Sequence, residues 1–311
     1  MTEVPALPAG YTARPPAMED AQAVLALMNA CDVADYGEPD SELEDFIYDW
    51  ESADLRRDAW LIDAPDGALA GYGLASHWSG GFQVDFCARP DLQEIGLQGW
   101  LLTRCEGRLR ELLASLNDIP PHIRSFVAHV NQPGRDALSE AGFAPEKYHF
   151  RMQIDMTGPP AKPVWPDGCA LRTVRPGEDD EAVFHFIEEA FARPGRTPQP
   201  FGEWRDYMMR PDHFRPDLWF LLYSQGELIG TAVCYDYDPY GWVRHLAVAD
   251  TWRRRGIGSM LLRHVFGEFY RRGKMRVALG VEAANETAYR LYERVGMRRV
   301  RQFDEYHKSI A

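Results

Sequence analysis

The chain has 311 residues, enough for two ordinary domains with a hydrophobic core in each. Its hydrophobic fraction of 45% is typical of a soluble globular protein, and no apolar run is long enough to span a membrane. The net charge of −13 is concentrated in residues 1–160, where 26 acidic residues stand against 11 basic ones, and this balance disfavours binding to nucleic acid.

The N-terminal segment and the cysteines indicate a reducing compartment. The first residues, "MTEVPALPAGYTARPP", contain no basic stretch followed by an apolar core, so we expect no secretory signal and a cytoplasmic location. The five cysteines are widely spaced, with no C-x-x-C pair and no histidine at ligand spacing. This pattern predicts neither a disulfide framework nor a metal site.

The first half of the chain predicts strands that alternate with helices. Residues 10–32 read as a short strand, an acidic turn and an amphipathic helix, and residues 67–78 as a strand entered through a glycine turn. Residues 84–102 read as a strand, a glycine loop and a helix, and residues 131–143 as a short helix that ends at a glycine.

A linker follows at residues 156–169, "MTGPPAKPVWPDGC", where four prolines and two glycines interrupt both periodic patterns. After it the chain repeats the four blocks of the first half in the same order. We therefore predict a tandem duplication of one α/β fold, with an N-terminal domain at residues 1–158 and a C-terminal domain at residues 159–311.

The second copy shows its elements clearly. The predicted strands are residues 218–223, 227–237, 242–248 and 275–283, and the predicted helices are residues 259–270 and 286–295. Strand, glycine loop, helix, strand and helix form a crossover layout in which a ligand binds at the carboxyl end of the first strand.

The glycine loop of the second copy, "TWRRRGIGSMLL", predicts an anion site. It brings unpaired backbone N–H groups to the positive end of a helix, and Gly256 and Gly258 leave room for an anion. No lysine followed by serine or threonine closes the loop, which excludes a P-loop. No third glycine stands at dinucleotide-binding spacing either.

Arg253, Gly256 and Gly258 form R-x-x-G-x-G between a strand that ends in Leu-Ala-Val and a helix that contains Leu-Leu. Together with Asn285 and "LYERVGM", this pattern resembles the GNAT superfamily of N-acyltransferases. The resemblance implies a fold of two tandem GNAT-like domains, each with a mixed, partly splayed sheet flanked by helices. It also implies acetyl-coenzyme A as the co-substrate and no metal.

The resemblance further implies that the amides of residues 254–259 hold the coenzyme A pyrophosphate. It implies a bulge near Ala247 in a strand that splays from residues 275–283 and pairs with the pantetheine arm. The residues that it assigns to coenzyme A binding are Leu246, Ala247, Val248, Arg253, Arg254, Arg255, Gly256, Ile257, Gly258, Ser259, Asn285, Ala288 and Tyr292. Asn285 also suits the N-cap of the helix that follows.

Acyl transfer to an amine needs a base for the amine proton and an acid for the departing thiolate. Tyr292 stands where many members of the family place a catalytic tyrosine, although it also fits the apolar stripe of its helix. Many relatives carry a strand glutamate as the base, whereas this chain has Arg244 and His245. The candidate bases are therefore His245, because histidine is the side chain type that ordinarily changes charge near neutral pH, and Glu282, with direct loss of the proton to water left open.

The acceptor site is expected on the opposite face of the sheet. The segment Cys234–Trp242, "CYDYDPYGW", offers aromatic walls with Asp236 and Asp238, which suit a cationic amine, although a solvated hairpin tip is the competing interpretation. Residues 201–219 are too long and too aromatic for a mere connector and are expected to line the same site.

The first copy is expected to be degenerate. Its loop has Gln93, Gly96 and Gln98 in place of the arginine and two glycines, and Leu138 stands in place of Tyr292. We therefore expect direct transfer of acetyl from acetyl-coenzyme A to a primary amine of a small molecule, through a tetrahedral intermediate, in the C-terminal domain alone.

Three points stay open. A non-catalytic coenzyme A binding or sensing protein would also need the glycine loop. Mycothiol synthases are tandem members of the superfamily with a similar layout, so a function like theirs is an alternative. The acceptor is expected to be a small molecule, with no nucleic-acid or membrane partner, and the oligomeric state is undetermined.

Overall fold

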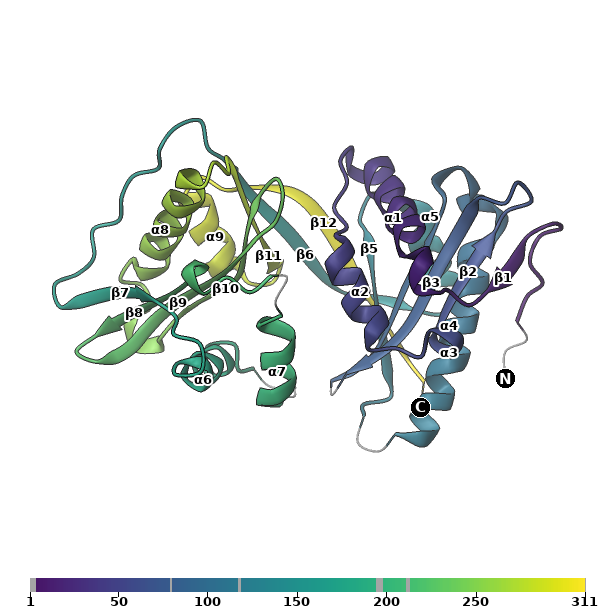
Figure 1. Ribbon diagram of the computed structural model, residues 1–311, viewed down its shortest axis with the longest axis horizontal. Helices are drawn as coiled ribbons and strands as arrows, with labels where there is room; N and C mark the ends of the chain where they lie inside the picture. Colours follow the sequence, from purple (N-terminus) through teal and green to yellow (C-terminus); the bar gives the residue numbers. More distant parts are fainter. Residues whose placement is uncertain (1–3, 79, 117–118, 194–197, 211–212, 311) are drawn as a thin grey trace. The chain divides into compact units, whose positions relative to one another are not determined.

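The computed structural model describes residues 4–310 except residues 79, 117–118, 194–197 and 211–212. The chain divides into two compact units. Unit 1 contains Met1–Tyr148 and Arg301–Ala311, and unit 2 contains His149–Val300 (Figure 1). None of the helices in these described ranges is both long and apolar enough to cross a membrane.

Unit 1 is a mixed sheet with helices on both faces. Its strands are β1 (Thr12–Arg14), β2 (Ala59–Asp63), β3 (Leu69–Trp78), β4 (Gly81–Ala88), β5 (His122–Ala128) and β12 (Arg298–Ser309), in the order β1-β2-β3-β4-β5-β12. Its helices are α1 (Ala21–Tyr36), α2 (Leu43–Glu51), α3 (Leu55–Asp58), α4 (Leu97–Ser115) and α5 (Gln132–Glu140). Strands β4 and β5 are parallel, and the other pairs are antiparallel.

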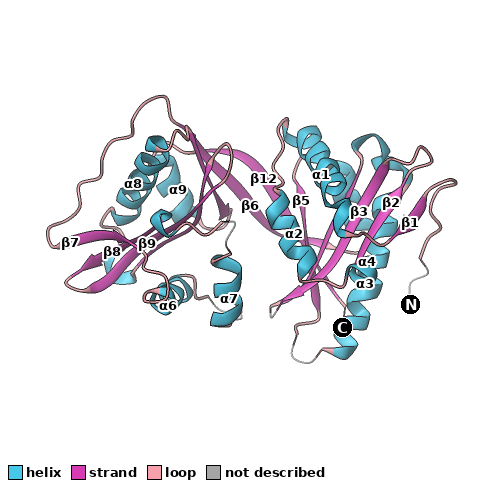
Figure 2. Cartoon of the chain, viewed as in Figure 1, coloured by secondary structure: helices cyan, strands magenta, loops and turns pink. Residues whose placement is uncertain are grey.

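Unit 2 repeats this arrangement. Its strands are β6 (Ala144–Asp155), β7 (Cys169–Thr173), β8 (Trp219–Ser224), β9 (Glu227–Asp236), β10 (Gly241–Val248) and β11 (Arg276–Glu282), in the order β6-β11-β10-β9-β8-β7. Its helices are α6 (Asp180–Ala190), α7 (Phe201–Met208), α8 (Ile257–Arg271) and α9 (Glu286–Arg294). Helices α8 and α9 lie on one face of the sheet, and α6 and α7 on the other (Figure 2).

The two units therefore share one topology, with a single parallel pair, β4–β5 or β10–β11, at the same place in each sheet. The predicted mixed α/β fold in two tandem copies is confirmed. The predicted helices of the second half also match α8 and α9 to within a residue or two.

The last strand of each copy completes the sheet of the other copy. Strand β6 ends the first copy in the sequence, yet its residues His149–Asp155 pair with β11 of the second copy. Strand β12 ends the second copy, yet its residues Phe303–Ser309 pair with β5. The predicted ranges 1–158 and 159–311 follow the order of the sequence, whereas each compact unit takes its sixth strand from the other half.

The core of unit 2 explains the pattern of α8. Leu261, Leu262 and Val265 are fully buried against the sheet, because their spacing puts them on one face of the helix. Phe269 extends this stripe and lies over Gly241, where a Cβ atom would come within 2.5 Å of its ring. Glycine at position 241 thus lets the end of α8 pack closely on β10.

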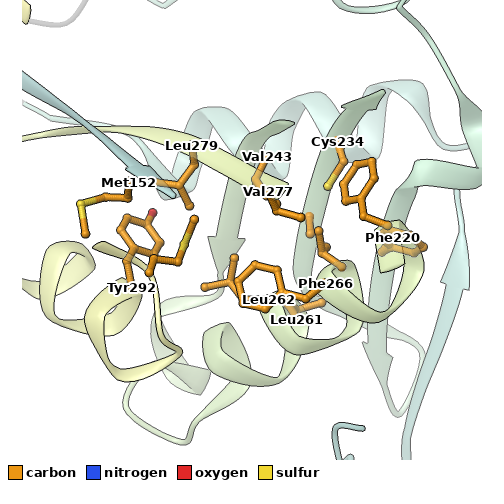
Figure 3. Close-up of a cluster of buried hydrophobic side chains, with 14 of the residues drawn as sticks. Met152, Phe220, Cys234, Val243, Leu261, Leu262, Phe266, Val277, Leu279 and Tyr292 are labelled. Carbon is orange, nitrogen blue, oxygen red and sulfur yellow. The ribbon is translucent and has the colours of Figure 1, made fainter. Parts of the chain in front are cut away.

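A substitution at Met152 would show whether the exchanged strand β6 contributes to the core of unit 2. It lies on β6, is fully buried, and packs in the same cluster as Leu279 and Tyr292 (Figure 3). We expect Met152→Ala to lower the free energy of unfolding of unit 2 by about 2–5 kcal/mol, because it leaves a cavity. The measurement is urea denaturation, with Met275→Ala, which is 45% exposed, as the control. Equal effects of the two substitutions would contradict the exchange.

Candidate functional site

Strand β10 separates from β11 part of the way along its length. The two strands pair at Gly241–Val277, Trp242–Ala278 and Val243–Leu279, and the described structure has no further pair between them. On its other side β10 stays paired with β9 to its last residue, Val248. The backbone of β10 that follows Val243 is therefore an open strand edge inside the unit, which can hydrogen-bond an extended ligand.

Leu246, Ala247 and Val248 lie on this open edge. Leu246 and Val248 pack toward the α8 and α9 core, and Ala247 is buried. The resemblance implied a bulge near Ala247, but the structure has the bulge between Val243 and His245. The bulge therefore lies where β10 leaves β11, because an extra residue bends the strand there.

The loop that follows β10 ends in the first turn of α8. Arg254 has φ +61° and Gly256, the N-cap of α8, has φ +82°. Within the described parts of the chain, the backbone N–H groups of residues 254–259 make no hydrogen bond. This stretch includes Ile257, Gly258 and Ser259, and its free donors at a helix N-terminus suit a phosphate.

The two glycines of the loop have different physical roles. Gly256 needs its positive φ, while the nearest atom to an added Cβ would be Met260 Cε at 3.5 Å. At Gly258 an added Cβ would lie 2.9 Å from Leu291 Cδ2 on α9. Gly258 thus lets α8 and α9 pack closely, a role that the sequence analysis did not identify.

The three arginines of the loop also differ. Arg253 donates to the backbone oxygens of Val248 and Ala190, each at 3.2 Å. Arg255 stacks on Trp252, with its guanidinium carbon 5.0 Å from the ring centroid. Arg254 is exposed, and in the described structure its side chain has no hydrogen bond, ion pair or ring contact, so its charge is available to an anion.

Asn285 is the N-cap of α9. Its side-chain oxygen accepts a hydrogen bond from the N–H of Ala288 at 3.1 Å. The predicted capping role is confirmed, and this bond occupies the backbone donor of Ala288. Both residues stay exposed or half-buried at the carboxyl end of β11, beside the separation of the strands.

Tyr292 lies in the core between α9 and the sheet, near Met152 and Leu279 (Figure 3). It is 8% exposed, and burial raises the pKa of its phenol to about 12. In the described parts of the chain its hydroxyl group has no hydrogen-bond partner. The ring thus belongs to the apolar stripe, while the hydroxyl keeps its proton at neutral pH and has no competing acceptor.

The structure separates the two candidate bases. His245 follows the bulge, on the α6 side of the sheet, with its ring 5.7 Å from that of Phe191. Glu282, at the end of β11, forms an ion pair of 2.6 Å with Arg193. Glu282 is therefore held by an arginine that follows α6, whereas His245 lies on the strand that leaves β11.

The aromatic segment lies on the same face as His245. Tyr235, Tyr237, Tyr240 and Trp242 form a file of rings with successive centroids 5.8–6.4 Å apart. Tyr235 is buried in the hydrophobic cluster under α6 and α7, whereas Trp242 is partly buried and packs against that cluster. Residues 201–219 supply Trp204, Met208 and Trp219 to this buried cluster, and their expected role in lining the acceptor site stays a prediction.

The two acids of that segment are already paired. Lys274 lies 3.5 Å from Asp236 and 3.1 Å from Asp238. The lysine balances only one of the two negative charges, and the side chain of Asp238 stays 95% exposed, so a site for a cationic amine at this segment remains a prediction. The lysine is remote in sequence, and no local pattern announces the contact. Among the described residues, no group of three or more His, Cys, Asp or Glu side chains could hold a metal ion.

Unit 1 keeps the backbone of this site but not its side chains. Gly96, with φ +86°, starts α4, and Asn131 caps α5 through the N–H of Gly134 at 2.8 Å. Gln98, at the place of Gly258, is 3% exposed, and Leu138, at the place of Tyr292, is fully buried. Unit 1 therefore has the helix N-terminus without the arginines, the second glycine or the tyrosine.

Sequence analysis missed Phe191 and Arg193, which follow α6 and contact His245 and Glu282. No motif marks them, because both contacts join elements that are far apart in the sequence. The sequence identified His245 and Glu282 as candidate bases, but it gave no sign of which residues contact them. The tertiary structure is what brings the end of α6 to the separated ends of β10 and β11.

Comparison with known proteins agrees with this geometry. A family model described as "Acetyltransferase (GNAT) family" matches residues 182–297. A mycothiol acetyltransferase of Catenulispora acidiphila is 30% identical over 258 residues, which cover 78% of this chain and 79% of the relative.

Solved structures agree as well. A GCN5-related N-acetyltransferase from Sphaerobacter thermophilus has 32% identity and a TM-score of 0.85, covering 98% of this chain and 97% of that one. A tandem GNAT protein from the clavulanic acid biosynthesis pathway shares the fold, with a TM-score of 0.73 at 14% identity, covering 97% and 99% of the two chains. The chain belongs to the GNAT family as a tandem, two-domain member, and it is an acetyl-coenzyme A-dependent acetyltransferase.

Proposed function

We propose that unit 2 transfers the acetyl group of acetyl-coenzyme A to a primary amine of a small molecule by direct attack. The observation that carries the proposal is the open edge of β10 next to the unbonded N–H groups of residues 254–259. Together they fit an extended chain that ends in a pyrophosphate. Only unit 2 combines this backbone with Arg254 and Tyr292.

The side chains of unit 2 divide the chemistry between the two faces of the sheet. The amine nitrogen bonds to the acetyl carbon, the carbon–sulfur bond breaks, and two protons must move. On the α6 face His245 takes the proton of the amine, directly or through a water molecule. On the α9 face Tyr292 supplies the proton for the departing sulfur. A backbone N–H of the open edge near Ala247 stabilises the developing oxyanion.

A second candidate function follows from the relatives. The relative from Catenulispora acidiphila is named a mycothiol acetyltransferase, and it aligns along most of this chain. A panel of acceptors that includes the unacetylated form of mycothiol, simple amines, amino acids and aminoglycosides separates the two candidates. If coenzyme A is released only with the unacetylated form of mycothiol, the reaction named for the relatives would be assigned to this chain.

The units offer a matched pair of glycines for deciding which one binds coenzyme A. Gly256 and Gly96 are both helix N-caps with φ of +82° and +86°. Neither has a neighbour closer than 3.5 Å to an added Cβ. A non-glycine residue in this conformation costs roughly 1–2 kcal/mol at either site. Gly256→Ala and Gly96→Ala should therefore lower stability equally.

Binding should separate the two variants. We expect Gly256→Ala to raise the Kd for coenzyme A about tenfold, because relief of the strain turns the loop N–H groups away from the pyrophosphate. Gly96→Ala should leave the Kd unchanged. Calorimetric titration with coenzyme A measures both, and urea denaturation checks the stability. Weaker binding in Gly96→Ala alone, or equally in both variants, would defeat the assignment to unit 2.

A further inference from the structure

The C-terminal end of α6 is held by an arginine from the coenzyme A loop. The last carbonyls of a helix have no partner within it, and a cation is favourable there. Phe191 and Ala192 donate their N–H groups to Ile187 and Glu189, while the oxygen of Ala190 accepts from Arg253 Nη2 at 3.2 Å.

The same guanidinium holds two further groups. Its Nε donates to the oxygen of Val248 at 3.2 Å, and its Nη2 lies 2.9 Å from Asp250. Val248 is the last residue of β10, on the stretch that does not pair with β11. Arg253 therefore ties the end of α6 to the open end of β10, and most of its donors face protein atoms.

The residues after Ala190 continue along the separated strands. Phe191 faces His245 with ring centroids 5.7 Å apart, and Arg193 pairs with Glu282 at the end of β11. The short segment Ala190–Arg193 thus touches the loop, β10 and β11 in succession. It lies on the face where the proposed function puts the amine, next to the proposed base.

We propose that Arg253 is a positioning residue for the acceptor side of the site and not a ligand of the coenzyme A phosphates. Its guanidinium sets where Ala190–Arg193 lies, and this segment in turn sets the position of His245 through Phe191. The proposal rests on the proposed function, since it takes the α6 face as the acceptor side.

Two kinetic consequences separate this role from phosphate binding. When Arg253 is lost, two carbonyl oxygens lose a charged donor and the segment moves, whereas the N–H groups of residues 254–259 stay in place. We expect Arg253→Gln to raise the KM for the amine about three- to tenfold, the range for loss of the hydrogen bond to Ala190, which is the bond that reaches α6. The Kd for coenzyme A should change less than about twofold, and Arg253→Lys should restore part of the acceptor KM.

The experiment compares Arg253→Gln and Arg253→Lys with two other arginine variants in the full chain. Arg290→Gln removes an exposed ion pair with Glu286 on α9 and serves as the control. Arg254→Gln removes the exposed arginine that has no hydrogen bond or ion pair within the described residues, and it should raise the Kd for coenzyme A. A higher Kd for coenzyme A in Arg253→Gln with an unchanged acceptor KM would overturn the inference.

Amide hydrogen exchange of residues 187–193 gives a readout that does not depend on catalysis. It should become faster in Arg253→Gln and stay unchanged in Arg290→Gln and Arg254→Gln. Unchanged exchange in Arg253→Gln would also overturn the inference. If wild type releases no coenzyme A with any amine, the proposed function fails, and the exchange measurement still decides whether Arg253 holds α6.

Discussion

Tyr292→Phe is expected to lower kcat for acetyl transfer by about 10²- to 10³-fold, the range for loss of a general acid. The phenylalanine ring fills the same space in the core. The hydroxyl has no hydrogen-bond partner in the described parts of the chain, so stability should change little. A steady-state assay of coenzyme A release measures the effect, with Tyr289→Phe on the same helix as the control. A kcat within about threefold of wild type would assign Tyr292 to packing alone.

The raised pKa of Tyr292 gives this prediction a second check. Burial moves the pKa of the phenol to about 12, from about 10 in an exposed tyrosine. The hydroxyl therefore stays protonated to higher pH, and kcat should not fall as pH passes 10. Folded-state stability should be intact below about pH 10 and fall as pH rises toward 12, because the unfolded chain loses this proton first. Tyr292→Phe should remove that part of the alkaline loss of stability.

The fragment of residues 149–300 is expected to fold and bind coenzyme A, whereas the fragment of residues 159–311 is expected to do neither. The two have nearly the same length and contain the same glycine loop. The first keeps the pairing of β6 with β11. The second lacks Met152 and Met156, which are buried in the core of unit 2, and leaves β11 without its antiparallel neighbour.

The expected loss in the second fragment is comparable with the whole stability of a domain. Each buried methionine contributes about 1.5–3 kcal/mol, and the backbone groups of β11 lose their partners as well. A domain typically has only about 5–15 kcal/mol of stability. Far-UV circular dichroism during urea denaturation and calorimetric titration with coenzyme A are the measurements. Cooperative unfolding of the 159–311 fragment with full affinity for coenzyme A would contradict the strand exchange.

Unit 1 depends on β12 in the same way. This strand brings the buried Asp304 and Tyr306 to unit 1, where Asp304 lies 2.9 Å from His129 Nδ1. The terminal strand of the chain thus stabilises the copy that is farther away in sequence. A change in one copy can therefore affect the fold of the other without any change in the acetyl-transfer site.

The parts of the site that sequence alone predicted are those set by neighbouring residues. The R-x-x-G-x-G pattern predicted a loop and a helix start, and Gly256 has the positive φ that such a turn requires. "NETA" predicted the cap formed by Asn285 and the N–H of Ala288. Apolar spacing predicted α8 and α9 because a helix repeats every 3.6 residues whatever it packs against.

The sequence did not predict the contacts between residues that are far apart along the chain. Glu282 pairs with Arg193, and Lys274 lies next to both Asp236 and Asp238. Gly258 carries a packing role that depends on Leu291 of another helix. In each case the two residues meet because of the tertiary fold, and the residues around each one in the sequence do not predict the contact.

The sequence by itself determined the fold of each copy, the glycine loop that begins α8 and the unequal side chains of the two copies. Those features depend on local backbone preferences and on residue identity, which act over a few positions. Only the tertiary structure decided that β6 and β12 are exchanged, that β10 leaves β11 after Val243, and that Arg253 donates a hydrogen bond to Ala190 at the end of α6. Strand pairing and side-chain contacts of this kind gain their free energy from groups that the sequence keeps far apart.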